Sequence, residues 1–247
     1  MENIPLPTTI NIEVDKKDPK KGTLTIEPLY PGYGPTVGNS LRRVLLSSLP
    51  GAAIFAFKIK GVKHEFSTIP YVKEDVVDIS LNLKRVNLKC FSDEPVKLEI
   101  EAKGEKVVTA GDISANSDIE IANPELPILT LTDKAASVEV SLWVKRGRGY
   151  EPVESRVGEE LEVNAIAIDA IFTPVRQVGY QVDNVRVGGR TDYDKVIMQI
   201  ETNGTITIED AVRDVSGILA EHFTLIAAKS GAGDKVTGQD DKEDEAE

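Results

Sequence analysis

The sequence predicts an α+β fold, with two amphipathic helices near opposite ends of the chain and a mostly β segment between them. Apolar residues recur at helical spacing over residues 37–49, and again over residues 211–226. The long middle of the chain carries short runs that alternate apolar with polar residues, as strands with one wet face do. Each helix therefore has an apolar face that must be covered.

The N-terminal part predicts two strands followed by a helix. Residues 10–14 and 24–27 alternate like strands, and the loop 28–35 leads into the helix. Thr36 is suited to cap the start of the helix, and the Pro50-Gly51 pair is suited to stop it. The apolar stripe of this helix consists of Val37, Leu41, Val44, Leu45 and Leu49.

Two adjacent arginines, Arg42 and Arg43, lie within this helix. Neighbouring helical residues point about 100° apart, so the two side chains cannot share one direction. At least one of them is expected to leave the apolar stripe and to present its guanidinium group on a rigid element. Periodicity alone permits an ordinary core helix, but the arginine pair favours a helix that is held by other proteins.

Residues 52–176 have a β texture. Strands are predicted over residues 54–59, 96–101, 138–144 and 164–172, and turn-rich stretches separate them. We interpret this segment as a mostly β insert.

The C-terminal part repeats the plan of the N-terminal part. Residues 196–201 predict a strand, Asn203-Gly204 a hairpin-type turn, and Thr207 with Asp210 a capping box that opens a helix. After residue 229 the chain becomes polar and acidic, so residues 230–247 predict a disordered tail. The stripe of the second helix consists of Ala211, Val212, Val215, Ile218, Leu219, Phe223 and Ile226.

Composition narrows the class of protein. The chain has 29 Lys and Arg against 41 Asp and Glu, a formal net charge of −12. Duplex DNA is gripped mainly by neutralising its phosphates, so extensive direct binding of nucleic acid is not expected. The single cysteine, Cys90, allows no intrachain disulfide. The N-terminus lacks signal-peptide features and no apolar run is long enough to span a membrane, so we expect a cytoplasmic protein without membrane contact.

Motifs of enzymes are weak in this sequence. Gly32, Gly34 and Gly38 precede a helix, but their spacing fits neither a P-loop nor a dinucleotide-binding loop, and tight turning with close helix packing explains them equally well. The two histidines and one cysteine give no metal-ligand spacing. We expect no cofactor, no metal and no catalytic site in this chain.

Two further groups of residues have simple structural explanations. Glu74, Asp75 and Asp78 could converge on a helix, but a solvated or partner-facing acidic surface is the better interpretation. The segment 146–150, with two arginines alternating with glycines, predicts a rigid loop or a protein contact rather than a nucleic-acid segment.

Five blocks, in order, resemble the alpha subunit of bacterial DNA-dependent RNA polymerase. They lie at residues 24–48, 74–84, 146–150, 190–195 and 201–205. The resemblance implies a non-catalytic subunit of a nucleotidyltransferase that transcribes DNA into RNA from ribonucleoside triphosphates. It implies a discontinuous dimerisation domain, residues 1–51 and 177–229, into which a mostly β domain, residues 52–176, is inserted.

The resemblance also implies partners and contact residues. A homodimer formed by the two long helices would be the platform for the beta and beta-prime subunits. Arg43 occupies a position that contacts the beta subunit, with Leu46 one turn along. Lys84 occupies a position on the beta-prime side, and Arg190 lies in an assembly segment, although a local ion pair with Asp192 is an equal alternative. The implied dimer interface consists of Val37, Leu41, Val44, Leu45, Leu219, Phe223 and Ile226.

Two other hypotheses remain open at this point. One is an enzyme that binds a nucleotide at the glycine loop, and the other is a dimeric scaffold unrelated to transcription. Relatives usually continue into a second globular domain, whereas this chain stops at Glu247. The sequence is either truncated or naturally lacks that domain, and the acidic ending favours a natural tail. Promoter preference, regulators and the role of the tail do not follow from the sequence.

Overall fold

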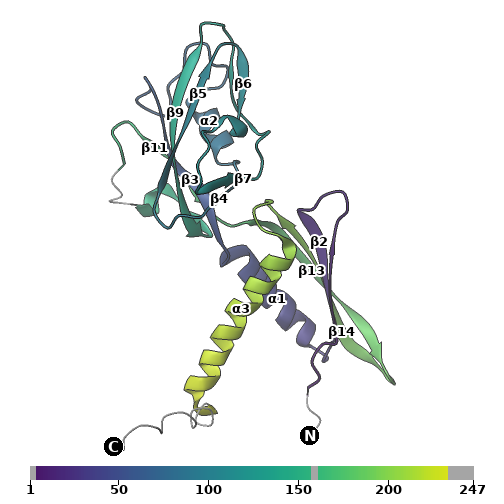
Figure 1. The fold of residues 1–247 in the computed structure, drawn as a ribbon. Coiled ribbons are helices and arrows are strands. Elements are labelled where there is room, and N and C mark those ends of the chain that lie inside the picture. Colours follow the sequence, from purple (N-terminus) through teal and green to yellow (C-terminus); the bar gives the residue numbers. More distant parts are fainter. Residues whose placement is uncertain (1–3, 157–160, 233–247) are drawn as a thin grey trace, which may run out of the picture.

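The computed structural model describes residues 4–156 and 161–232. It has two lobes that meet at a narrow waist (Figure 1). The terminal lobe, residues 4–49 and 175–232, is built from both ends of the chain, and the middle lobe comprises residues 50–174. The predicted α+β class, with a mostly β segment inserted between the two halves of a helix-bearing unit, is confirmed.

The terminal lobe is one antiparallel sheet with two helices on one face. The strand order is β1-β2-β14-β13, so β2 from the N-terminal part pairs with β14 from the C-terminal part. Helix α1 packs on β13 and β14 and contacts α3. The elements are β1 (Thr9–Val14), β2 (Lys21–Leu29), α1 (Tyr33–Ser47), β13 (Val175–Val187), β14 (Arg190–Thr202), α3 (Ile208–Ala227) and a π-helical turn (Ala228–Ala232).

The middle lobe is built around a sheet with the strand order β5-β9-β3-β4-β7. Alternate residues of β9 are buried, as expected for a strand with one wet face. The elements are β3 (Pro50–Ile59), α2 (Val76–Leu83), β4 (Leu88–Cys90), β5 (Val96–Lys103), β6 (Lys106–Thr109), β7 (Ile119–Ile121), β8 (Pro127–Leu131), β9 (Ser137–Arg148), β10 (Tyr150–Glu151), β11 (Ile166–Ala167) and β12 (Ala170–Ile171).

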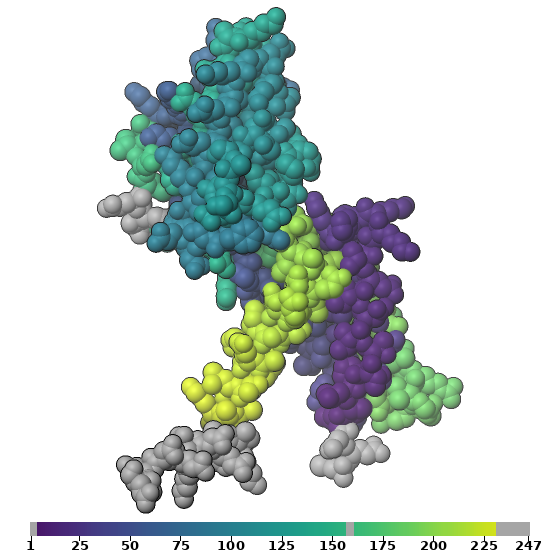
Figure 2. Space-filling model, viewed as in Figure 1, coloured from purple at the N-terminus to yellow at the C-terminus, as the bar shows by residue number. Residues whose placement is uncertain are grey.

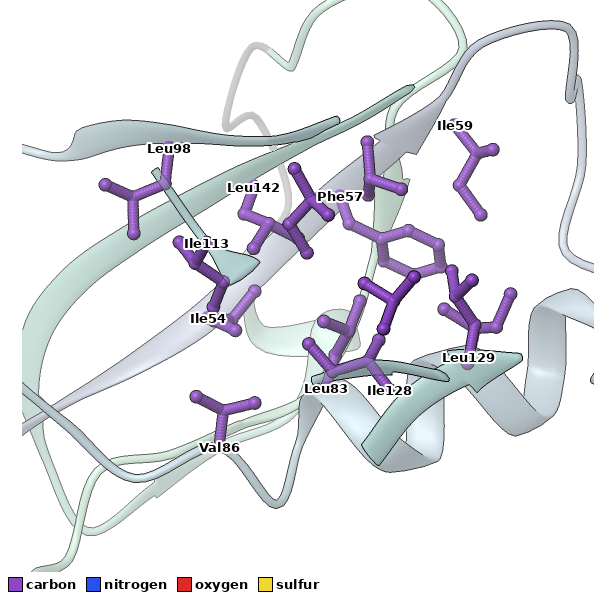
Figure 3. Packing of buried hydrophobic residues seen from close by; sticks show 14 of the residues in the cluster. Ile54, Phe57, Ile59, Leu83, Val86, Leu98, Ile113, Ile128, Leu129 and Leu142 are labelled. Atoms are coloured by element: carbon purple, nitrogen blue, oxygen red, sulfur yellow. The ribbon is translucent and has the colours of Figure 1, made fainter. Parts of the chain in front are cut away.

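Each lobe has its own apolar core. In the middle lobe, Phe57 of β3 is fully buried among leucine and isoleucine side chains from β8, β9 and α2 (Figure 3). In the terminal lobe, Leu24 and Met198, which lie opposite each other on β2 and β14, pack under both helices. Because each lobe buries its own apolar side chains, neither needs the other to form a core.

The structure corrects three predicted local features. Helix α1 begins at Tyr33 after Gly32, so Thr36 lies inside the helix and does not cap it. The predicted strand 164–172 is two short strands, β11 and β12, which pair with different partners. Gly204 turns the chain from β14 into α3 rather than closing a hairpin.

Other predicted features are confirmed. The Thr207 side chain accepts a hydrogen bond from the backbone N–H of Asp210 at 3.1 Å and caps α3. The predicted strands 10–14, 24–27, 54–59, 96–101, 138–144 and 196–201 all lie within observed strands. Most of the predicted tail, from residue 233 onward, lies outside the described residues.

Candidate protein-binding surface

Helix α1 is held close to the sheet by two glycines that face β13. A Cβ atom on Gly34 would lie 2.6 Å from Val182 Cγ1, and one on Gly38 would lie 2.6 Å from the ring of Tyr180. No larger residue fits at either position without displacing its neighbour. The glycines therefore serve close packing, which fixes the direction of the opposite face of α1.

The start of α1 is capped by a carboxylate from the other end of the chain. Asp194 of β14 is buried, and its Oδ2 atom accepts hydrogen bonds from the backbone N–H groups of Gly32 at 2.9 Å and Gly34 at 2.8 Å. A negative charge at a helix N-terminus is stabilising. The same carboxylate occupies the donors that a bound phosphate would need, so the geometry disfavours a nucleotide at this glycine loop.

The two adjacent arginines of α1 have different surroundings. Arg42 turns back to its own sheet, where its Nε donates to the backbone oxygen of Val178 at 3.2 Å. Arg43 is exposed, and its guanidinium group makes no hydrogen bond or ion pair within the described residues. The prediction that at least one arginine leaves the stripe is confirmed, and Arg43 is the one available to another molecule.

The apolar stripe of α1 is divided between the core and the surface. Leu41 and Leu49 are buried, and Leu45 is 0% exposed, all within this chain's own core. Leu45 has no surface left for a second chain, and Leu41 has little, because the sheet already covers them. The sequence predicts both residues in a dimer interface as well as against the sheet, and the packing of a single chain shows only the contact with the sheet. Val37, Val44 and Leu46 are half-buried and retain exposed surface.

Helix α3 is buried at its start and bare at its end. Ala211 and Val215 lie in the core, whereas Phe223 is 61% exposed and Ile226 is 59% exposed. The C-terminal half of α3, yellow in Figure 2, extends away from the body of the molecule. Leu219 is half-buried between these two regions. Large apolar side chains in a row on a projecting helix indicate a surface that another protein covers.

Lys84 lies at the C-terminal end of α2, on the middle lobe. Its ammonium group is 2.9 Å from the Asp169 carboxylate, which also accepts a hydrogen bond from the backbone N–H of Val153 at 3.0 Å. The hydrogen bond from Lys84, followed by that from the Val153 backbone, lowers the pKa of Asp169. Lys84 therefore orders a neighbouring loop as well as carrying charge at the surface.

Arg190 lies at the tip of the β13–β14 hairpin and forms the local ion pair. Its Nε and Nη2 atoms donate to the two carboxylate oxygens of Asp192 at 3.0 and 2.7 Å. The pair raises the pKa of Arg190 and lowers that of Asp192. The guanidinium carbon also lies 5.4 Å from the ring centre of Tyr193. The local alternative for Arg190 is thus confirmed, and any partner would meet a charge that is already paired.

Comparison with known proteins identifies the family. Over 229 residues the chain is 46% identical to the DNA-directed RNA polymerase subunit alpha of Symbiobacterium thermophilum, covering 93% of this chain and 72% of that protein. The chain belongs to the family of DNA-directed RNA polymerase alpha subunits. The proteins of the same name from Alkaliphilus oremlandii and Moorella thermoacetica are 50% identical over 204 residues and 47% identical over 227 residues. These alignments cover 83% and 92% of this chain, and 64% and 72% of the relatives.

The middle lobe of this alpha-subunit chain has its own family match. Residues 57–173 match the family described as the RNA polymerase Rpb3/RpoA insert domain. The match begins within β3 and ends just before β13. No helix among the described residues is long and apolar enough to cross a membrane.

The residues that resembled enzyme motifs have structural roles in this alpha subunit. The Glu74 carboxylate accepts hydrogen bonds from the backbone and hydroxyl of Thr130 at 2.6 and 2.9 Å. Asp75 caps α2 by accepting a hydrogen bond from the N–H of Asp78 at 2.7 Å. Within residues 4–156 and 161–232, no three His, Cys, Asp or Glu side chains are grouped to hold a metal ion.

Sequence reasoning missed two apolar surfaces. Val77 and Leu81 are exposed one turn apart on α2 and lead toward Lys84. Ile10 of β1 is 64% exposed, although it lies opposite the buried Ile26 and so faces the side of the sheet that carries the core. Alternation in the sequence assigns Ile10 to the apolar face of its strand, but it cannot show that the helices leave Ile10 uncovered.

Proposed function

We propose that this chain is the non-catalytic assembly subunit of RNA polymerase, which forms a homodimer and holds the beta and beta-prime subunits. The observation that carries the proposal is the bare apolar end of α3. This row of side chains has no cover in the described chain and stands on a projecting helix. A second copy of the chain supplies an identical surface, and twofold pairing covers both at once.

The terminal lobe has a complementary apolar surface. The core-facing side of β1 carries Ile10, Ile12 and Val14, and only Ile12 is packed against the core. Leu6, which precedes β1, is also exposed. In the proposed dimer, α1 and α3 cross the helices of the partner, and the end of α3 extends toward the partner's β1. The proposed contact from the two helices consists of Val37, Val44, Leu219, Phe223 and Ile226.

We assign beta-subunit binding to the exposed face of α1. Arg43 supports this assignment because its guanidinium group is free, exposed and carried on a helix held rigidly by Gly34 and Gly38. Leu46 adds apolar surface one turn along. We assign the beta-prime side to Lys84, with the exposed Val77 and Leu81 beside it. Arg190 would contribute through its paired, planar charge at the hairpin tip.

The proposed division into domains lies within two residues of the lobe boundaries at 49/50 and 174/175. The dimerisation domain would be residues 1–51 and 177–229, and the inserted domain residues 52–176. The matched region, residues 57–173, supports this division. We propose that catalysis belongs to the large subunits, since the acidic residues Glu74 and Asp75 serve internal contacts.

A binding measurement tests the proposal. Arg43→Ala should leave the dimer intact and weaken capture of the purified beta subunit by roughly tenfold or more, the effect expected for an interface arginine. Arg213→Ala is the matched control, because Arg213 is an exposed helical arginine that is paired with Asp210 at 2.6 Å. If both variants capture beta as the wild type does, the assignment of α1 is wrong.

A further inference from the structure

The two lobes are joined covalently at one crowded point. Strand β3 enters the middle lobe beside the segment that leaves it, and a Cβ atom on Gly51 would lie 1.8 Å from the backbone oxygen of Phe172. A Cβ atom on Gly147 would lie 2.6 Å from the Phe172 ring. The backbones cannot move closer or slide at this crossing. A single crossing, however, still permits one lobe to rotate relative to the other.

A second connection lies beside this crossing and is made by Asn87 of the middle lobe. Its Nδ2 atom donates to the backbone oxygen of Asn203 at 3.0 Å, and its Oδ1 atom accepts from Arg176 Nη2 at 2.6 Å. Both partners belong to the terminal lobe, and Arg176 lies on β13. One amide side chain thus spans the waist with a donor and an acceptor, and the bond to the guanidinium group is charge-assisted.

Asn87 is itself fixed in the middle lobe. Its backbone N–H donates to Oδ1 of the buried Asn123 at 2.8 Å, and its backbone oxygen accepts from the N–H of Ala122 at 2.8 Å. On the other side, Asn203 is fixed in the terminal lobe, where its Oδ1 atom accepts a hydrogen bond from the backbone N–H of Thr205 at 2.9 Å. Its own N–H donates to the backbone oxygen of Pro174, the last residue before β13, at 2.8 Å and adds a backbone contact at the waist. Each end of the connection is therefore anchored to its own lobe.

Two clefts lie beside this connection among the described residues. A cleft of about 240 Å³ lies between the lobes, lined by Leu88 and Phe91 on one side and Ile206 on the other. A second cleft of about 450 Å³ lies between Lys89 and the start of α3. Because the apolar cores of the two lobes are separate, the polar contacts at the waist have a large share in fixing the angle between the lobes.

We infer that Asn87 is a positioning residue that sets the angle between the two lobes by holding Arg176 and the Asn203 carbonyl together. The consequence for assembly rests on the proposed function. Arg43 stands on the terminal lobe, and Lys84, three residues before Asn87, stands on the middle lobe. A fixed angle keeps the surfaces assigned to the beta and beta-prime subunits at one separation.

The inference is tested by measuring the distance between the lobes in the full chain. In a Cys90→Ser background, spin labels are attached to Glu101→Cys on β5 and Gln181→Cys on β13, both exposed positions on strands. An excess of unlabelled chain restricts the signal to distances within one protomer. Pulsed electron resonance then gives the distribution of distances.

Asn87→Ala should broaden this distribution and shift its mean, because losing the connection raises the population of other lobe angles by about tenfold or more. Asn82→Ala is the matched control, since Asn82 donates a 3.0 Å hydrogen bond to Ile128 within the middle lobe. Arg176→Ala removes one of the two hydrogen bonds of the Asn87 side chain by shortening an exposed residue. It should broaden the distribution less than Asn87→Ala does.

Wild-type distributions for Asn87→Ala and Arg176→Ala would overturn the inference, as would equal broadening in Asn82→Ala. This readout uses no partner protein, so it is independent of whether the proposed function holds. If the distribution broadens, capture of beta-prime by Asn87→Ala provides the separate test of the consequence for assembly.

Discussion

Removing the Phe223 side chain is the most informative perturbation of the proposed dimer. Phe223 lies on the projecting half of α3, is 61% exposed, and has no role in the core of its own lobe. Phe223→Ala should therefore leave the fold of the single chain intact. Any effect on association then comes from lost contact with a second chain.

The size of the effect follows from the uncovered area. A phenylalanine side chain presents roughly 200 Å², so about 120 Å² of Phe223 remains uncovered. At about 25 cal/mol per Å², covering this area stabilises by roughly 3 kcal/mol per chain, or about 6 kcal/mol for the two copies of a twofold pair. The alanine at this position retains some contact, and neighbouring side chains of the second chain shift into the vacated space. We expect about half of this value to be lost, which raises the dissociation constant about a hundredfold.

Sedimentation velocity over a range of concentrations measures this constant. Glu221→Ala is the matched control, because Glu221 is exposed two residues earlier and points to the opposite side of the helix. The control should associate as the wild type does. Equal association of all three proteins would refute the reasoning that the bare end of α3 is covered by a second copy.

Three further predictions concern the chain itself. Asp194→Ala orphans two N–H donors at the start of α1 and should lower the free energy of unfolding by about 2–3 kcal/mol in denaturant titration, with Asp194→Asn intermediate. Gly38→Ala should cost about 1–3 kcal/mol by crowding the Tyr180 ring, and Tyr180→Ala should relieve part of that cost in the double mutant. The folded-state pKa of Asp169 is lowered, so this carboxylate stabilises the fold. Its contribution to the free energy of unfolding is complete above the ordinary carboxyl pKa of about 4 and is lost as pH falls through the lowered value. Lys84→Ala should reduce the fall of the melting temperature at acid pH. An unchanged fall would contradict the assignment of Lys84 as the main cause of the lowered pKa.

Local patterns predicted the elements whose causes are local. The capping of α3 by Thr207 needs only a partner three residues away. Strands β9 and β14 follow from the alternation of apolar and polar residues. The start of α1 could not be predicted in this way, because its cap comes from Asp194, which is 160 residues from Gly34 in sequence. A cap from a distant residue leaves no signal in the sequence next to the helix.

The prediction of a strand over residues 164–172 failed for a related reason. The segment is apolar and alternates, but Ile166 pairs with Phe57 of β3 whereas Ala170 pairs with Glu151 of β10. The choice of neighbours, not local propensity, breaks the strand. The long β13 also gives no local strand signal, because its outer half is exposed and its alternation is weak.

The candidate surface was predicted in part. The sequence located the helices and the arginine pair, but periodicity treats every residue of an apolar stripe alike. It could not separate Leu45, which is covered by its own sheet, from Phe223, which is bare. That distinction depends on where α3 leaves the body of the molecule, and only the packed structure contains it.

In the proposed assembly, two copies of this chain form the platform for the large subunits. Native mass spectrometry of the complex purified through a tag on this chain tests it most directly. We expect one mass containing two copies of the chain with two much larger polypeptides. A complex with a single copy, or a chain recovered without the large polypeptides, would contradict it.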